Sequence, residues 1–253
     1  MSDRFREVAD GPIGAHLARP DTRIEDADGW YRLITPSANR GSLNEVVRAR
    51  IAPRWLDAEV DRVISEYRSL GVPFKWVVGP DSDAPGLACA LDERRLDAWD
   101  VWAMAAHPED VPEVAGIEVR RVPPTGVYAE VQARGWEVPL DAMREDLTHT
   151  GPAHRCFVAT VDGKPVGAAA SVHKPRSAYL TGAVVLPEAR GRGVYRALLH
   201  ARAQAALAEG LPLLTTHARA HTSGPILARV GFDTVYTYRI FSCDPRPYTS
   251  TSD

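Results

Sequence analysis

Two glycines and two arginines form the part of this sequence whose residue types are best suited to chemistry. They make up Arg190-Gly-Arg-Gly193, which follows an apolar stretch ending at Pro187 and precedes a helical pattern beginning at Val194. The first turn of a helix leaves backbone N–H groups unpaired and carries a partial positive charge. Glycine lets the backbone approach a bound anion closely, and Arg190 and Arg192 add positive charge. This order of strand, loop and helix predicts a site for a pyrophosphate group.

Other nucleotide-binding patterns fit this loop less well. The pattern Gly-x-x-x-x-Gly-Lys-Ser/Thr is absent from the sequence. The dinucleotide pattern Gly-x-Gly-x-x-Gly fails because Arg196 stands where a third glycine would follow Gly191 and Gly193. From these residues alone, a solvated loop that only caps an ordinary helix remains as the alternative.

The loop and its flanks resemble the acyl-CoA signature of the GNAT superfamily of N-acetyltransferases. That signature is Arg/Gln-x-x-Gly-x-Gly/Ala after a strand ending in Val-x-Pro. Val185-Leu-Pro187 matches the strand end, Arg190 takes the Arg/Gln position and Gly193 takes the first glycine position. Tyr195 occupies the last position, where Gly or Ala is usual. Gly231-Phe232, after the expected last helix, is a second feature of the family.

This resemblance extends over roughly residues 117–241 and implies that the chain binds acetyl-CoA as a cosubstrate. It implies that the strand ending near Leu186 separates from the strand ending near His217, and that the acyl group lies in the gap. A backbone N–H near Val184 or Val185 would polarise the acyl carbonyl, and an amine would attack it directly. The cofactor-binding residues implied are Ala183, Val184 and Val185 for the pantetheine arm and Arg190, Gly191, Arg192, Gly193, Val194 and Tyr195 for the pyrophosphate.

The residues that move protons are harder to assign. Many family members carry a tyrosine acid four residues before Gly-Phe, and here that position is Leu227. Histidine titrates near neutral pH, and His217 and His221 lie at and just after the expected strand end. Tyr179 and Thr181 lie on the separating strand. We expect the catalytic groups among these four side chains, each of which also suits a purely structural role.

The periodicity of the second half predicts a mixed, mostly antiparallel sheet flanked by helices, an α/β (α+β) fold of the GNAT type. Asp162-Gly163 is typical of a hairpin turn, and Gly210 ends an apolar helical face. The expected strands are 117–122, 154–161, 165–172, 177–186, 212–217 and 232–241, and the expected helices are 125–135, 139–147, 194–209 and 223–230.

The first half repeats part of this order, which suggests an internal duplication. We expect a strand at 43–51, a helix at 55–70, a strand at 73–78, a helix at 84–96 and a strand at 98–104. No glycine pair separates the first strand from the first helix. The expected domains are therefore a degenerate GNAT-like domain at 1–110 without a phosphate loop, an acyl-CoA-binding domain at 117–243 and a flexible tail at 244–253.

Composition narrows the remaining function classes. A net charge of −3, from 30 basic and 33 acidic residues, does not indicate a nucleic-acid-binding protein. The three cysteines are far apart and form no CxxC pair, so no metal site is expected. The sequence begins without the apolar core of a signal peptide and contains no apolar run of roughly 20 residues, so we expect a cytoplasmic protein without a membrane partner.

We therefore expect an N-acetyltransferase that acts on a primary amine of a small molecule, an amino acid or a peptide. Two alternatives remain open: an acyl-CoA-binding sensor or partner subunit that transfers nothing, and another acyl-CoA reaction such as decarboxylation in the same cleft. The sequence leaves the acceptor, the acyl chain length and the oligomeric state open.

Overall fold

The protein divides into two compact units in a computed structural model that describes residues 2–27, 29–80, 82 and 85–245. The larger unit contains the chain up to Leu17 together with Trp102–Tyr236. The smaller unit contains Ala18–Val101 and the chain from Thr237 onward. Strands β5 (Asp97–Ala106) and β11 (Asp233–Cys243) each supply residues to both units. Of the tail expected at 244–253, residues 246–253 lie outside the described part of the chain.

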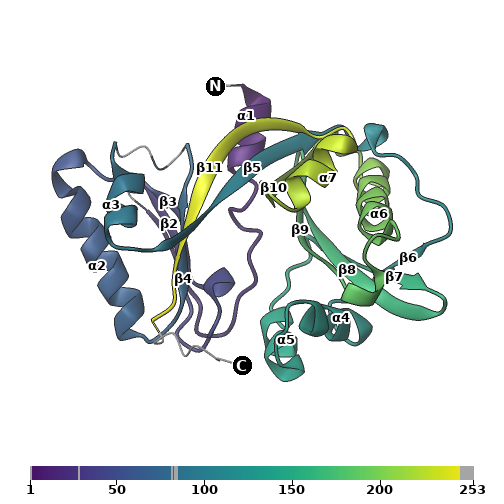
Figure 1. The fold of residues 1–253 in the computed structure, drawn as a ribbon, viewed down its shortest axis with the longest axis horizontal. Helices are drawn as coiled ribbons and strands as arrows, with labels where there is room; N and C mark the ends of the chain where they lie inside the picture. Colours follow the sequence, from purple (N-terminus) through teal and green to yellow (C-terminus); the bar gives the residue numbers. More distant parts are fainter. Residues whose placement is uncertain (1, 28, 81, 83–84, 246–253) are drawn as a thin grey trace. The chain divides into compact units, whose positions relative to one another are not determined.

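The sheet of the larger unit confirms the mixed, mostly antiparallel arrangement (Figure 1). Its strands follow the order β5-β10-β9-β8-β7-β6. Neighbours from β6 to β9 pair antiparallel, whereas β9 and β10 pair parallel. Their bounds are β6 Glu118–Val122, β7 His154–Val161, β8 Lys164–His173, β9 Ala178–Val185 and β10 Leu214–Arg219.

Helices cover both faces of this sheet (Figure 1). Helices α4 (Val127–Gly135) and α5 (Leu140–Leu147) lie on one face, and α6 (Val194–Ala208) and α7 (Ser223–Arg229) lie on the other. Successive side chains of a strand point to opposite faces. On β8, Ala168 and Ala170 accordingly pack in the cluster with α4 and α5, and Ala169 packs in the cluster with α6.

The larger unit also includes a helix that the sequence did not predict, α1 (Asp3–Ala9). The Ser2 hydroxyl accepts a hydrogen bond from the Phe5 N–H and begins this helix, as an N-cap residue does. Glu7 accepts hydrogen bonds from Arg176 and from the Ser177 hydroxyl. These contacts join the first residues of the chain to the segment before β9.

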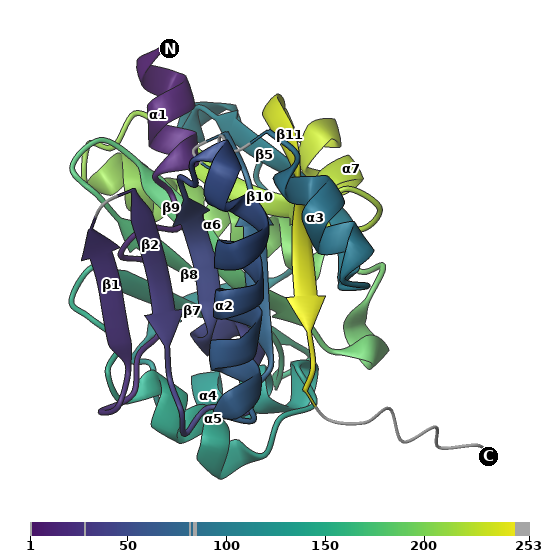
Figure 2. The same cartoon turned by 90° about the vertical axis from the view of Figure 1, so that its left-hand side faces the viewer.

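The smaller unit has strands in the order β1-β2-β3-β4-β11, with β3 and β4 parallel. Both of its helices lie on the same side of these strands (Figure 2). Trp76 is fully buried in its core, where the Tyr67 and Phe74 rings stack with centroids 4.5 Å apart. The bounds are β1 Arg23–Ala27, β2 Trp30–Ile34, β3 Glu45–Ala49, α2 Leu56–Ser69, β4 Phe74–Val78 and α3 Leu87–Glu93.

The prediction for this unit was correct for β3, α2, β4 and β5 but missed β1 and β2. Helix α3 is shorter than the helix expected at 84–96, and Ala84 lies outside the described residues. Short 3-10 turns occur at Gly41–Leu43, Pro53–Trp55, Pro108–Asp110 and Pro187–Ala189. Among the residues described here, no helix is long and apolar enough to cross a membrane.

Candidate functional site

The Gly/Arg loop connects the 3-10 turn after β9 to the first residue of α6. Gly191 and Gly193 have φ angles of 75° and 89°, a left-handed conformation that side chains disfavour. Gly193 is the N-cap of α6 and has no side chain to bond the first N–H groups of the helix. These donors therefore remain available to an external anion.

Both loop arginines lie at the surface and make contacts that an anion could replace. Arg190 donates from Nε to the carbonyl oxygen of Val185, 3.3 Å away, at the end of β9. Arg192 pairs with Asp162 in the turn between β7 and β8, with Nη2 3.0 Å from Oδ2. Both side chains of that ion pair are more than half exposed, so the pair is weak.

The Tyr195 side chain packs away from the Gly/Arg loop. It packs against the apolar cluster between α6 and α7, and burial raises the pKa of its hydroxyl. It faces Arg202, a buried arginine that donates from Nη1 to the carbonyl oxygen of Ala170, 3.3 Å away. The aromatic residue that departs from the family signature therefore belongs to the core and leaves the loop open.

Strands β9 and β10 separate beside this loop, as the resemblance implies. Their parallel ladder has three pairs and ends at Thr216 and Leu180, where the Thr216 hydroxyl donates to the Leu180 carbonyl oxygen at 3.0 Å. Strand β9 continues to Val185 and β10 to Arg219 without a further pair between them. The backbone of β9 from residue 181 onward therefore lacks a β10 partner.

The part of β9 that lacks a β10 partner still pairs with β8 on its other side. This pairing contains a bulge that sequence analysis did not identify. Val184 lies opposite Ala168 and Thr181 opposite Ala170, so two residues of β9 face one residue of β8. One of the two is Gly182, whose φ angle is 60°. A glycine inside a strand pattern is the sequence signal that indicates such a bulge.

The expected catalytic residues Tyr179 and His217 lie together on neighbouring strands. Their rings meet edge to face with centroids 5.7 Å apart, and the Tyr236 ring lies 6.2 Å from that of His217. His217 donates from Nε2 to the carbonyl oxygen of Val8, 2.9 Å away. Burial, and secondarily the nearby charge of Lys174, lower the pKa of His217 to about 4, so its ring is neutral at neutral pH.

The first residues of the chain cover this pair of rings. Val8 binds His217, and a Cβ at Gly11 would lie only 2.7 Å from the Tyr179 ring. Lys174 donates to the carbonyl oxygens of Asp10 and Ile13, which holds the same segment in place.

The other expected catalytic residues differ in their exposure. Thr181 is half-buried at the start of the unpaired part of β9. His221 is exposed in the turn between β10 and α7. Leu227, at the position of the usual tyrosine acid, is buried in the apolar core between α6 and α7.

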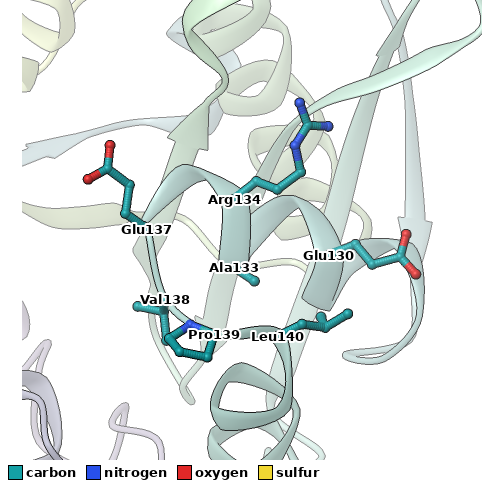
Figure 3. A pocket seen from close by; sticks show the side chains of 7 residues that line it. All are labelled: Glu130, Ala133, Arg134, Glu137, Val138, Pro139 and Leu140. Carbon is teal, nitrogen blue, oxygen red and sulfur yellow. The ribbon is translucent and has the colours of Figure 1, made fainter.

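A surface hollow lies between α4 and α5, and none of the expected site residues lines it (Figure 3). The side chains of Glu130 and Arg134 point outward from α4 at its rim. Arg134 Nη2 lies 2.9 Å from Glu188 Oε1, and this ion pair joins α4 to the turn before the Gly/Arg loop. The remaining lining residues are Ala133, Glu137, Val138, Pro139 and Leu140.

The described residues offer no cluster of metal ligands, and Cys156 is a poor candidate for a nucleophile. They contain no group of three or more His, Cys, Asp or Glu side chains that could hold a metal ion. Cys156 is buried, and burial raises the pKa of its thiol to about 11. A thiol in that state is protonated at neutral pH and is a poor nucleophile.

Comparison with known proteins agrees with this geometry. The family model described as the acetyltransferase (GNAT) family matches residues 125–232. No curated protein matches the chain. Residues 125–232 therefore form a domain of the GNAT family, with the loop and the separated strands inside it.

Solved structures extend the similarity over the whole chain. A functionally unknown conserved protein from Staphylococcus epidermidis has a TM-score of 0.70 at 10% identity, covering 88% of this chain and 94% of its own. A GCN5-related N-acetyltransferase from Kribbella flavida has a TM-score of 0.67 at 18% identity and covers 98% of both chains. A tandem GNAT protein from the clavulanic acid biosynthesis pathway has a TM-score of 0.59 at 18% identity, covering 95% and 88%. At these identities the likeness establishes the fold: the chain has the GNAT fold, like that of a tandem member.

Proposed function

We propose that this protein is an N-acetyltransferase that uses acetyl-CoA and acts on a primary amine of a small molecule, an amino acid or a peptide. One observation carries the proposal. The open N-terminus of α6 at Gly193 and the end of the β9–β10 ladder at Thr216 lie on consecutive elements of one domain. The open N-terminus of α6 suits a pyrophosphate. The end of the ladder leaves backbone groups of β9 free of a β10 partner, and the pantetheine arm of CoA can pair with them as an added strand.

The proposed roles of the backbone follow from that arrangement. The pyrophosphate binds the N–H groups from Arg190 to Tyr195, with Arg190 and Arg192 adding charge. The pantetheine arm pairs with β9 from Ala183 to Val185 in place of a neighbouring strand. An N–H near Val184 or Val185 polarises the acyl carbonyl and stabilises the oxyanion as it forms.

The reaction then needs no covalent intermediate with the protein. The amine nitrogen attacks the thioester carbon, a C–N bond forms, and the C–S bond breaks as the CoA thiolate leaves. The attacking nitrogen loses one proton and the thiolate gains one. Proximity of the two reactants supplies much of the acceleration of such a transfer.

The proton-transfer groups stay a proposal within the set His217, His221, Tyr179 and Thr181. His217 is neutral at neutral pH, but the low pKa makes it a weak base, and Nε2 donates to Val8. Thr181 has the advantage of lying at the start of the part of β9 that lacks a β10 partner, whereas Tyr179 still pairs with Thr215 inside the ladder.

One observation favours a second candidate, an acyl-CoA-binding sensor that transfers nothing. Leu227 fills the core at the position where many family members have their tyrosine acid. Product analysis separates these activities. A transferase releases CoA from acetyl-CoA only with an amine, a decarboxylase consumes malonyl-CoA without one, and a sensor consumes neither.

We further propose that the smaller unit is a GNAT-like repeat without the phosphate loop. In the larger unit, parallel β9 and β10 are joined through α6. In the smaller unit, parallel β3 and β4 are joined through α2. The β3–β4 ladder has two pairs and ends at Val46 and Trp76, although both strands continue. The segment from β3 to α2 contains Pro53–Trp55 in place of a glycine pair.

The domain boundaries and the location of the protein also remain proposals. We place the repeats at 1–110 and 117–243, although the compact units divide the chain differently. The chain up to Leu17 and the end of β5 belong to the larger unit, and the end of β11 belongs to the smaller one. Three free cysteines, Cys89, Cys156 and Cys243, support a reducing compartment, so we propose the cytoplasm.

Calorimetric titration with acetyl-CoA tests the cofactor site. Gly193→Glu places a carboxylate where the phosphates would bind and abolishes binding if the proposal holds. Gly210→Glu is the matched control, because Gly210 also has a positive φ of 70° but lies in open space beyond the other end of α6. If the folded wild type fails to bind acetyl-CoA and CoA, or if both variants bind equally well, the proposed site is wrong.

A further inference from the structure

A buried glutamine on α4 holds the bulge of β9 in place. Gln132 is only 4% exposed, and its Nε2 donates to the carbonyl oxygen of Gly182 at 2.6 Å. Gly182 belongs to the bulge, next to the segment that the proposed function assigns to the acyl-CoA. No expected site residue comes from α4, so Gln132 is a new candidate.

The surroundings of Gln132 leave its amide a single orientation. Trp136 Nε1 lies 2.7 Å from Gln132 Oε1, and an indole N–H can only donate, so this oxygen is the acceptor. Nε2 must then be the atom that faces Gly182, and it also donates to the Tyr128 hydroxyl at 3.1 Å. The side chain is therefore held at both ends of its amide.

This contact sets the direction of a backbone donor in the bulge. A trans peptide is planar, so the N–H of Ala183 points opposite to the carbonyl of Gly182. Gln132 holds that carbonyl toward α4, and the Ala183 N–H consequently points away from α4. Because the β10 ladder ends before this point, it does not orient the peptide.

We infer that Gln132 is a positioning residue for the acyl-transfer step, acting through the peptide between Gly182 and Ala183. The inference rests on the proposed function. With the carbonyl held, the unpaired stretch of β9 presents its N–H groups in one geometry to the acyl end of acyl-CoA. Without the hydrogen bond from Gln132, the bulge relaxes and the N–H groups of β9 lose their alignment. The geometry of the proposed phosphate loop is unaffected.

The decisive experiment measures kcat and the Kd of CoA in Gln132→Met. This variant preserves the size of the side chain but removes all three hydrogen bonds of the amide. We expect kcat to fall about tenfold to a hundredfold, the range that the loss of one aligned buried hydrogen bond gives. The Kd of CoA, which lacks the acyl group, should change less than about threefold. A purely structural residue would lower stability and leave kcat of the folded fraction unchanged.

Three further variants separate the Gly182 contact from the other effects of substituting Gln132. Tyr128→Phe removes the other acceptor of Nε2 and keeps the Gly182 contact, so it should retain kcat. Gln132→Glu replaces the donor with a carboxylate and should lose kcat as Gln132→Met does. Gln204→Glu makes the same change on the exposed surface of α6 and should have no effect.

The outcomes distinguish this inference from the proposed function. A wild type that transfers no acyl group under any condition overturns the proposed function. An active wild type with unchanged kcat in Gln132→Met, or equal losses in Tyr128→Phe, overturns only the role of Gln132. If Gln132→Met does not fold, Gln132→Glu decides the question by the same split between kcat and the Kd of CoA.

Discussion

His217, whose ring is covered by the first residues of the chain, makes the stability of the protein depend on pH. Substitution of this one residue can isolate the effect. His217 has a pKa of about 4 in the folded protein, against an ordinary value of 6.5. The lowered value means that the folded state disfavours the proton, so the unfolded state binds it first as the pH falls. The stability present above pH 6.5 is therefore lost between about pH 6.5 and pH 4.

The magnitude follows from the size of the shift. Each unit of pKa corresponds to about 1.4 kcal/mol, so the full loss for His217 is about 3 kcal/mol. About 2 kcal/mol of it is lost by pH 5, where the unfolded imidazole is almost fully protonated and the folded one is not. Against a typical domain stability of about 5–15 kcal/mol, this effect is large enough to measure.

The assay compares the wild type with His217→Gln, which retains an N–H donor for Val8 but cannot titrate. Urea unfolding at pH 7.5, 6 and 5 gives the free energy of unfolding of each protein. His16, whose pKa burial also lowers to about 4, contributes equally to both and cancels in the difference. We expect the free energy difference between the two proteins to shift by about 2 kcal/mol in favour of the variant from pH 7.5 to pH 5.

A difference that stays constant with pH would refute this reasoning. It would mean that water reaches His217 and that the residues around Val8 do not cover it. The same result would restore His217 as a base with an ordinary pKa, so the measurement also bears on the catalytic mechanism.

Two further predictions concern the loop and the strand beside it. Gly135→Ala should destabilise the protein by about 1–3 kcal/mol, because a Cβ there would lie 1.9 Å from Val184 Cγ2. Val184→Ala in the same chain should recover part of this loss in thermal unfolding, and strictly additive effects would contradict the close packing. Asp162→Asn should strengthen CoA binding by about twofold at low salt, since it frees Arg192 from a weak ion pair. Calorimetry at two salt concentrations checks this, and weaker binding would show that Asp162 holds Arg192 in its working position.

The sequence by itself determined the parts of this protein that depend on neighbouring residues. The position of the Gly/Arg loop between a strand and a helix could be predicted because strand, glycines and helix are contiguous. Periodicity located the strands and helices of the larger unit. The turn at Asp162-Gly163 and the helix stop at Gly210 follow from the conformations that glycine allows. The repeated strand–helix–strand order in the first half was likewise visible as a local pattern.

Only the tertiary structure decided which distant residues meet. Nothing near Gln132 in the sequence indicates that its amide binds Gly182, fifty residues away. Nothing near His217 indicates that Val8 covers it. Helix α1 and the division of β5 and β11 between the two units also escaped prediction. The physical reason is the same in each case: hydrogen bonds and burial between remote segments depend on how the chain packs, whereas local patterns report only the conformation of the segment that carries them.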